Sequence, residues 1–292
     1  MTMSLPIADV KPHALRLSDR EFSELRALIE STLGIQISDS KRLMLETRIM
    51  RRMRELSLDT ISAYCDRLRD KLRSHQELQH FFDLVTTNKT SFFREPSQLQ
   101  LLTDNYLGDY LRAAQIQQRP LRVWSAACSS GQEVWTLCMM LENVRARLRL
   151  QADFVVLGSD VSSRVLKVAI AAKYASSELN DVPHEYRSHF MKSRDPSRGL
   201  VRVTPFLRQR AAFVQLNLMN ERYELDGAFD IVLLRNALIY FPRERQLRII
   251  ERVHETLLPG GIFAVGLTET LHGVGLPLQH VGSSIYLKQA TR

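Results

Sequence analysis

A loop of small residues and a later aspartate have the types and spacing of ligand-binding residues. The run WSAACSSGQE, residues 124–133, has small side chains that let the backbone approach a ligand closely and turn sharply into a helix. It holds one glycine, Gly131, so the GxGxxG pattern that cradles the pyrophosphate of a dinucleotide is absent. Asp160 ends the run LGSD, where a carboxylate can accept both hydroxyl protons of a ribose. A tight strand-to-helix turn and a helix cap remain the structural alternatives for these two features.

Alternating strands and helices, which begin at Leu121, would position both features. Such alternation predicts a mostly parallel, doubly wound α/β sheet, whose ligands bind beyond the carboxyl ends of the strands. The expected strands are 121–127, 154–159, 213–216, 229–234 and 262–266, with a closing edge strand at 284–288, and the expected helices are 132–148, 163–173 and 242–258. Three short segments predict a small antiparallel insertion: His189–Met191, Leu200–Val203 and Ala211–Val214.

The first 85 residues predict a small all-α domain. Ser18 and Glu21 form a capping-box pattern that starts a helix, and Gly34 ends it after Leu33. Three more helices are expected at 41–56, 60–71 and 74–84. The expected organisation is a helical domain at 1–85, a linker and connecting helix at 86–120, and a sheet domain at 121–292 with its insertion at about 189–211.

Composition narrows the class of protein without choosing a partner. The chain has 292 residues and a net charge of +8, which favours an acidic partner: nucleic acid, an anionic membrane surface or an acidic protein. No apolar run approaches the roughly 18 to 20 residues that span a bilayer, and no secretory signal opens the chain, so a cytoplasmic protein is expected. Three distant cysteines, Cys65, Cys128 and Cys138, fit reduced thiols, and the histidines show no metal-ligand spacing, so no metal is expected.

Five motifs occur in an order that is specific to one family. They are TTNKTSFFRE at 86–95, WSAACSSGQE at 124–133, GSD at 158–160, LNL at 216–218 and LRNALIYF at 234–241. In this order they resemble the CheR family, class I S-adenosylmethionine methyltransferases that esterify glutamate side chains of chemotaxis receptors. The resemblance covers nearly the whole chain, including the helical N-terminal domain.

The resemblance implies a cofactor, S-adenosyl-L-methionine, and a product, S-adenosyl-L-homocysteine. It also implies the site: linker residues that close over the cofactor, an acid near its methionine end, an acid on the ribose, a pair that flanks the adenosine, and a pair after the fourth strand. These cofactor-binding residues are Asn88, Thr90, Arg94, Glu133, Asp160, Asn217, Leu218, Arg235 and Asn236. Arg94 and Tyr240 match the positions that line the methyl-transfer centre. Two structural alternatives remain: Arg94 could form an ordinary surface ion pair, and Tyr240 could only pack at the start of a helix.

The chemistry that the family performs needs few catalytic groups. A glutamate side chain has a pKa of about 4.3, so at neutral pH it is already a carboxylate nucleophile and requires no general base. The enzyme's task is to align the carboxylate oxygen, the methyl carbon and the sulfur. Arg94 is suited to hold a carboxylate by two hydrogen bonds.

A basic helix predicts how the receptor docks. Lys41, Arg48 and Arg52 fall within roughly 40° on a helical wheel, and Arg51 flanks them. The resemblance implies that this helix meets an acidic helix of a methyl-accepting chemotaxis receptor, by an attraction that weakens with salt. It also implies a monomer that is recruited to membrane receptor arrays without inserting into the membrane. The insertion resembles a subdomain that grips a receptor tail in some members; here its loop differs, so tail binding stays open.

Two rival functions belong to other classes. A nucleic-acid methyltransferase would suit the positive charge, but enzymes that act on base amino groups usually carry an Asn/Asp-Pro-Pro-aromatic motif after the fourth strand. This chain has RNAL at 235–238 instead. A non-catalytic cofactor-sensing module is disfavoured because the residues of the family's site are retained: Asn88, Arg94, Glu133, Asp160 and Tyr240.

Overall fold

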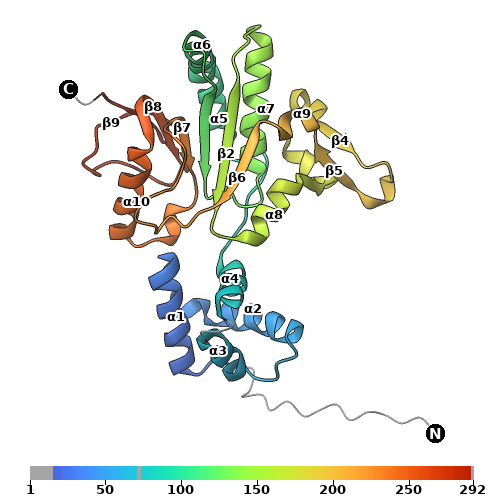
Figure 1. Ribbon diagram of the computed structural model, residues 1–292, viewed down its shortest axis with the longest axis vertical. Helices are drawn as coiled ribbons and strands as arrows, with labels where there is room; N and C mark the ends of the chain where they lie inside the picture. The colour runs from blue at the N-terminus through green and yellow to red at the C-terminus, as the bar shows by residue number, and fades with distance from the viewer. Residues whose placement is uncertain (1–15, 71–73, 291–292) are drawn as a thin grey trace. The chain divides into compact units, whose positions relative to one another are not determined.

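The computed structural model describes residues 16–70 and 74–290 (Figure 1). The contacts divide the chain into two compact units, Met1–Thr86 and Thr87–Arg292, which we name the helical unit and the sheet unit. Among the described residues, no helix is long and apolar enough to cross a membrane.

In its described residues, the helical unit contains four helices around a small apolar core, as predicted. They are α1 (Asp19–Leu33), α2 (Arg42–Glu55), α3 (Ile61–Arg69) and α4 (Ser74–Val85). The capping box of Ser18 and Glu21 begins α1, and Gly34, in the left-handed conformation, ends it. A 3₁₀ turn at Asp39–Lys41 precedes α2. Residue 71, the predicted end of the third helix, lies outside the described residues.

The sheet unit contains a seven-stranded sheet in the order β6-β2-β1-β7-β8-β10-β9. The first five strands of this order pair in parallel, and β10 is antiparallel to both of its neighbours. The predicted doubly wound, mostly parallel sheet is confirmed. The chain moves from β1 to β2 on one side and later to β7 on the other, so the switch in strand order lies between β1 and β7. The strands are β1 (Leu121–Ala126), β2 (Phe154–Asp160), β6 (Ala211–Gln215), β7 (Phe229–Leu234), β8 (Leu257–Val265), β9 (Leu278–Gly282) and β10 (Ile285–Lys288).

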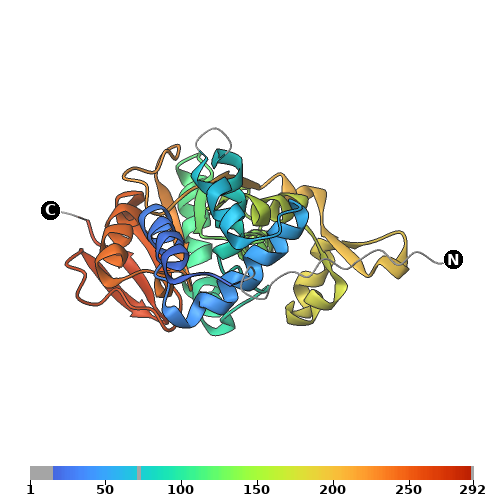
Figure 2. The same ribbon diagram turned by 90° about the horizontal axis from the view of Figure 1, so that it is seen from below.

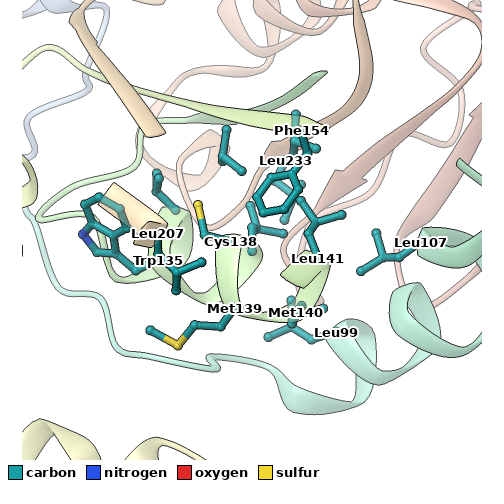
Figure 3. Close-up of a cluster of buried hydrophobic side chains, with 14 of the residues drawn as sticks. Leu99, Leu107, Trp135, Cys138, Met139, Met140, Leu141, Phe154, Leu207 and Leu233 are labelled. Carbon is teal, nitrogen blue, oxygen red and sulfur yellow. The ribbon is translucent and has the colours of Figure 1, made fainter. Parts of the chain in front are cut away.

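Both faces of the sheet are covered by helices, because alternate residues of its central strands belong to two different apolar clusters. Leu233 of β7 packs in one cluster with residues of α7, and its neighbour Val232 packs in the other with Ile250 of α10. Figure 3 shows the first cluster, in which Cys138 and Leu141 of α7 lie beside Phe154 of β2. The helices are α5 (Pro96–Leu102), α6 (Gly108–Ile116), α7 (Gln132–Arg147), α8 (Ser163–Ala171), α9 (Pro205–Arg208) and α10 (Arg243–Glu255).

The small antiparallel sheet is present, but one of its predicted strands is wrong. It has the order β3-β5-β4, with β3 at Lys173–Ala175, β4 at Phe190–Lys192 and β5 at Leu200–Val203. Segment 211–214, predicted for this insertion, belongs to β6 of the main sheet. The missed strand β3 follows α8 directly, because Ala172 takes a left-handed φ of 52° and ends the helix. Figure 2 shows this small sheet projecting at the opposite side of the unit from β9 and β10.

Two further expectations at the C-terminal edge need correction. The predicted edge strand at 284–288 is β10, but β9 pairs outside it, so β10 is not the edge. The helix predicted at 242–258 is α10, which begins one residue later, because Pro242 is its N-cap.

Candidate functional site

Three segments with unusual backbone meet at the carboxyl ends of β1 and β7. Left-handed φ values occur in the linker, in the loop after β1 and directly after β7, at Phe93, Glu95, Ala127, Ser129 and Asn236. A non-glycine residue pays of order 1 kcal/mol or more for this conformation, and such residues concentrate at functional sites. The segments are joined: Ser129 Oγ donates to the Asn88 carbonyl over 2.9 Å, and Arg235 Nη2 donates to the Arg94 carbonyl over 2.6 Å.

Asp160 ends β2 beside the loop that follows β1. Its two oxygens accept the backbone N–H groups of Ser129 and Ser162, each over 2.9 Å. The residue that caps α8 is Ser162, whose hydroxyl accepts from Val165 N–H. Asp160 therefore braces the loop after β1. A carboxylate oxygen can accept more than one hydrogen bond, so its two oxygens remain suited to a diol.

A buried arginine connects the linker, α7 and the end of β7. The side chain of Arg235 is only 2% exposed, and it forms ion pairs with Glu133 over 2.8 Å and with Glu95 over 3.0 Å. Ser125 Oγ donates to the other oxygen of Glu133 over 2.7 Å. Arg235 Nε is buried and has no partner among the described residues. The predicted site residues Glu133 and Arg235 are thus brought together, with one buried donor left to satisfy.

Two glutamates of this region were not predicted as site residues. Glu95 accepts from Asn236 Nδ2 over 2.9 Å and from Leu267 N–H over 3.1 Å, in addition to its pair with Arg235. Burial raises its pKa, but the hydrogen bond from Asn236 and the charge of Arg235 outweigh burial and leave the pKa below its usual value. Glu95 is the last residue of the TTNKTSFFRE motif. Glu269, which is 7% exposed, gave no comparable signal in the sequence.

Glu269 binds backbone N–H groups at the turn after β7. One of its oxygens accepts from Gly266 over 2.7 Å and from Asn236 over 2.8 Å, and the other accepts from Ile239 over 3.3 Å. Burial raises the pKa of this carboxyl, and the backbone hydrogen bonds only partly oppose burial. The turn that Glu269 caps is the 3₁₀ turn Leu238–Tyr240, which presents Tyr240.

Arg94 and Tyr240 both lie partly exposed on these joined segments. Arg94 Nη1 donates to the Lys89 carbonyl over 3.1 Å, within the linker. In the described part of the chain this is the one hydrogen bond that its guanidinium makes, although the group has five N–H donors. Arg94 therefore offers a cationic group with spare donors on the linker, and Tyr240 lies on the turn after β7.

Comparison with family models decides the assignment. The model described as CheR methyltransferase, SAM binding domain, matches residues 88–287, and the model described as CheR methyltransferase, all-alpha domain, matches residues 20–86. The chain belongs to the CheR methyltransferase family.

Relatives agree with this assignment along nearly the whole length. The chain is 32% identical to a chemotaxis protein methyltransferase of Escherichia coli (strain K12), over 98% of each chain. It is also 32% identical to chemotaxis protein methyltransferase 2 of Pseudomonas aeruginosa, over 91% of this chain and 92% of that one. A solved glycopeptide N-methyltransferase, complexed with sinefungin, is similar at a TM-score of 0.30 and 14% identity, over 60% of this chain and 62% of that one. That last likeness is too low to carry an argument.

The CheR methyltransferase domain uses S-adenosylmethionine, and the polar groups at the strand ends fit this cofactor. The cofactor supplies an electrophilic methyl group on a sulfonium. The unpaired Nε of Arg235 could donate to its carboxylate, Glu133 could accept from its ammonium, and Asp160 could accept from its ribose hydroxyls. Gly266 allows a close approach of backbone here, because a Cβ at that position would lie 2.6 Å from Asn236 Nδ2.

The remaining predicted cofactor residues lie on the linker and after β6. Asn88 and Thr90 are partly buried in the linker. Asn217 Oδ1 accepts from Met219 N–H over 2.9 Å and so forms a turn, and Leu218 is 7% exposed in the cluster that contains Trp124. Asn236, predicted to contact the cofactor, has its side chain and its backbone N–H bound by Glu95 and Glu269.

The predicted docking helix α2 does not present all of its arginines outward. Arg48 Nη1 donates to the carbonyls of Leu84 over 2.7 Å and Thr86 over 3.1 Å. Arg52 forms two hydrogen bonds with Glu77, which is buried. Arg51 is exposed, and Lys41 is partly buried. The expectation that Arg48 and Arg52 serve as surface docking charges therefore needs correction, because both bind groups inside the helical unit.

The described cysteines and potential metal ligands form neither a reactive thiol site nor a metal site. Cys65, Cys128 and Cys138 are free and buried. Burial raises the pKa of Cys65 to about 12, which keeps its thiol protonated at neutral pH. No group of three histidine, cysteine or acidic side chains that could hold a metal occurs within residues 16–70 and 74–290.

Proposed function

We propose that this chain transfers a methyl group from S-adenosylmethionine to glutamate carboxylates of methyl-accepting chemotaxis receptors. The family membership supports methyl transfer in chemotaxis. The observation that carries the choice of acceptor is Arg94, a partly exposed guanidinium with one described hydrogen bond, on a linker joined to the strand ends. A guanidinium with spare donors suits a carboxylate, because it can form a bidentate pair with the two carboxylate oxygens.

The proposed reaction balances without a proton transfer. A carboxylate oxygen forms a bond to the methyl carbon as the carbon–sulfur bond breaks, and the sulfur keeps the electron pair. S-adenosylhomocysteine and a methyl ester are the products. Arg94 orients the carboxylate, while Glu133, Asp160 and Arg235 hold the donor. If Arg94 bound the carboxylate too tightly, it would stabilise the ground state and slow methyl transfer. Its proposed role is therefore to orient the carboxylate.

Docking in this proposal uses the exposed part of the basic helix. Arg51 and Arg54 are exposed on α2, one turn apart, and Lys41 lies near its start. An acidic receptor helix would be attracted to this surface, with the chain acting as a monomer that is recruited to receptor arrays. We do not include Arg48 or Arg52 in the docking surface.

Labelled-methyl transfer tests the proposal. Purified protein is incubated with methyl-labelled S-adenosylmethionine and membranes that contain candidate receptors, and mild base is then added. The proposal expects label on the receptor that base releases as methanol. A parallel reaction with DNA and RNA tests the rival acceptor. Label that resists base, or label found on nucleic acid and absent from receptors, would reject carboxylate methylation.

A further inference from the structure

The two unpredicted glutamates converge on one residue. Glu95 accepts from the side-chain amide of Asn236, and Glu269 accepts from its backbone N–H, over 2.9 and 2.8 Å. Asn236 has a φ of 55°, in the left-handed region that asparagine adopts more readily than most other non-glycine residues. Its main-chain and side-chain nitrogens each donate to a carboxylate from a distant part of the sequence.

Each glutamate also holds a segment that carries a residue of the proposed reaction. Glu95 directly follows Arg94 and pairs with Arg235, which in turn donates to the Arg94 carbonyl. Glu269 accepts from Ile239 N–H and so caps the turn that presents Tyr240. Arg94 and Tyr240 are far apart in sequence, and the hydrogen bonds through Asn236 link their two segments.

We infer that Glu95 and Glu269 are positioning residues, which act through Asn236 to fix Arg94 relative to Tyr240. This inference rests on the proposed function. Neither carboxylate needs to touch substrate or cofactor. Their charges are suited to the task because a hydrogen bond to an ionised acceptor is shorter and stronger than one between neutral groups. Asn236 then serves to join the two segments instead of contacting the cofactor.

The separation of kcat from binding tests this inference. In Glu95→Ala and Glu269→Ala, misplacement of the reacting groups by about 1 Å would lower kcat roughly 100-fold. The dissociation constant for S-adenosylhomocysteine and the KM for receptor should stay within about threefold, since Arg235 keeps Glu133 and the Arg94 carbonyl as partners. Glu95→Gln keeps an oxygen for Asn236 and should recover part of kcat. Unchanged kcat in both alanine variants would overturn the inference.

Asp230 provides a matched control, because it lies near the start of β7, the strand whose other end precedes Asn236. It is 4% exposed, and it accepts from two nitrogens of Arg119 over 2.8 and 2.6 Å and from Arg122 N–H over 2.9 Å. Asp230→Ala should lower the melting temperature at least as much as the two glutamate variants while its folded fraction keeps the wild-type kcat. An equal fall of kcat in Asp230→Ala would show that loss of stability explains the glutamate effects, and the inference would be rejected.

Hydrogen exchange separates this inference from the proposed function. If the wild type forms no receptor ester, the proposed function fails, and the linkage between segments can still be measured. Glu95→Ala should speed amide exchange in 87–94 and in 234–241 together, because it frees both segments. If exchange became faster in only one of these two segments, the inferred linkage between them would be wrong, even in a fully active enzyme.

Discussion

Two arginine–carboxylate networks, one in each unit, differ in what surrounds them. In the helical unit, Arg52 uses all three of its nitrogens, on Glu77 and Glu55, and Tyr64 also donates to Glu77. The residues of this network lie in regular helices. In the sheet unit, Arg235 binds two acids and a carbonyl but retains a buried Nε without a described partner.

The difference shows that a buried ion pair does not by itself mark a functional site. Such pairs give weak support for stability as well, because the cost of desolvation offsets much of the attraction. The network in the sheet unit is distinguished by left-handed residues such as Glu95 and Asn236. A buried donor without a hydrogen-bond partner among the described residues occurs in both networks, Arg235 Nε in one and Arg67 Nε, 3.8 Å from Glu77, in the other. Strained backbone beside unused hydrogen-bonding capacity indicates binding, whereas the network of Arg52, which lies in regular helices, indicates structure.

The largest expected effect separates the two networks by stability. Glu77→Ala leaves Arg52 without its main partner, and removal of one member of a buried pair costs about 3 kcal/mol. Urea denaturation should show this loss of free energy of unfolding. Calorimetry should show unchanged affinity for S-adenosylhomocysteine, because the predicted cofactor residues belong to the sheet unit. Weaker cofactor binding in this variant would contradict the division of roles.

Arg94→Ala should give the opposite result: a large loss of activity at little cost in stability. The side chain makes one described hydrogen bond, so the free energy of unfolding should change by about 0.5 kcal/mol or less. Receptor methylation should fall roughly 100-fold in kcat/KM, as expected when a group that holds the reacting carboxylate is lost. Arg112→Ala, an exposed arginine of α6, is the control. Near-wild-type turnover by Arg94→Ala would refute its role.

A smaller effect is expected at the docking surface. Arg51→Glu reverses an exposed charge and should raise the KM for receptor by up to about fivefold, since exposed charge pairs contribute roughly 0.2–1 kcal/mol. The effect should shrink as salt is added. Arg112→Glu makes the same change of charge on α6 and should leave the KM unaltered. Identical kinetics for both variants would remove α2 from the docking surface.

The smallest expected effect is a difference in how the two glutamates, Glu77 and Glu269, make the free energy of unfolding depend on pH. The pKa of Glu77 is lowered: burial raises it, but the hydrogen bond and charge of Arg52 outweigh burial. Its contribution to stability is therefore full above the ordinary carboxyl pKa and is lost as pH falls through the lower folded value. Burial raises the pKa of Glu269, so its carboxylate disfavours the folded state increasingly as pH rises through that raised value.

Unfolding free energies of the wild type, Glu77→Gln and Glu269→Gln, measured across acidic to neutral pH, check these signs. As pH rises, the wild type should gain stability relative to Glu77→Gln and lose it relative to Glu269→Gln. If the difference in unfolding free energy between wild type and variant changed with pH in the same direction for both glutamates, the predicted contrast would be wrong.

The sequence predicted the parts of the fold that follow from local pattern. Continuous apolar runs such as Phe229–Leu234 indicated buried strands, and the capping box at Ser18 located the start of a helix. Strands β3 and β9 were missed because they are short and carry no clear alternation of apolar and polar residues. Their pairing depends on partners that the fold brings to them.

The site was predictable where a motif carries it, and not where distant segments meet. Glu133 and Asp160 stand at strand or helix ends that the pattern located. The contact between Glu95 and Asn236 joins residues 141 positions apart, and no local spacing encodes it. The inward turn of Arg52 toward Glu77 was missed for the same reason, since a helical wheel places an arginine on a face but does not show what packs there.

Titration of the purified protein with S-adenosylhomocysteine in a calorimeter tests the central claim most directly. We expect saturable binding to the wild type, at least tenfold weaker binding to Asp160→Ala through loss of the ribose contacts, and unchanged binding to Asp230→Ala. An absence of binding to folded wild type, or equal affinity in Asp160→Ala, would contradict a cofactor pocket at the carboxyl ends of the strands.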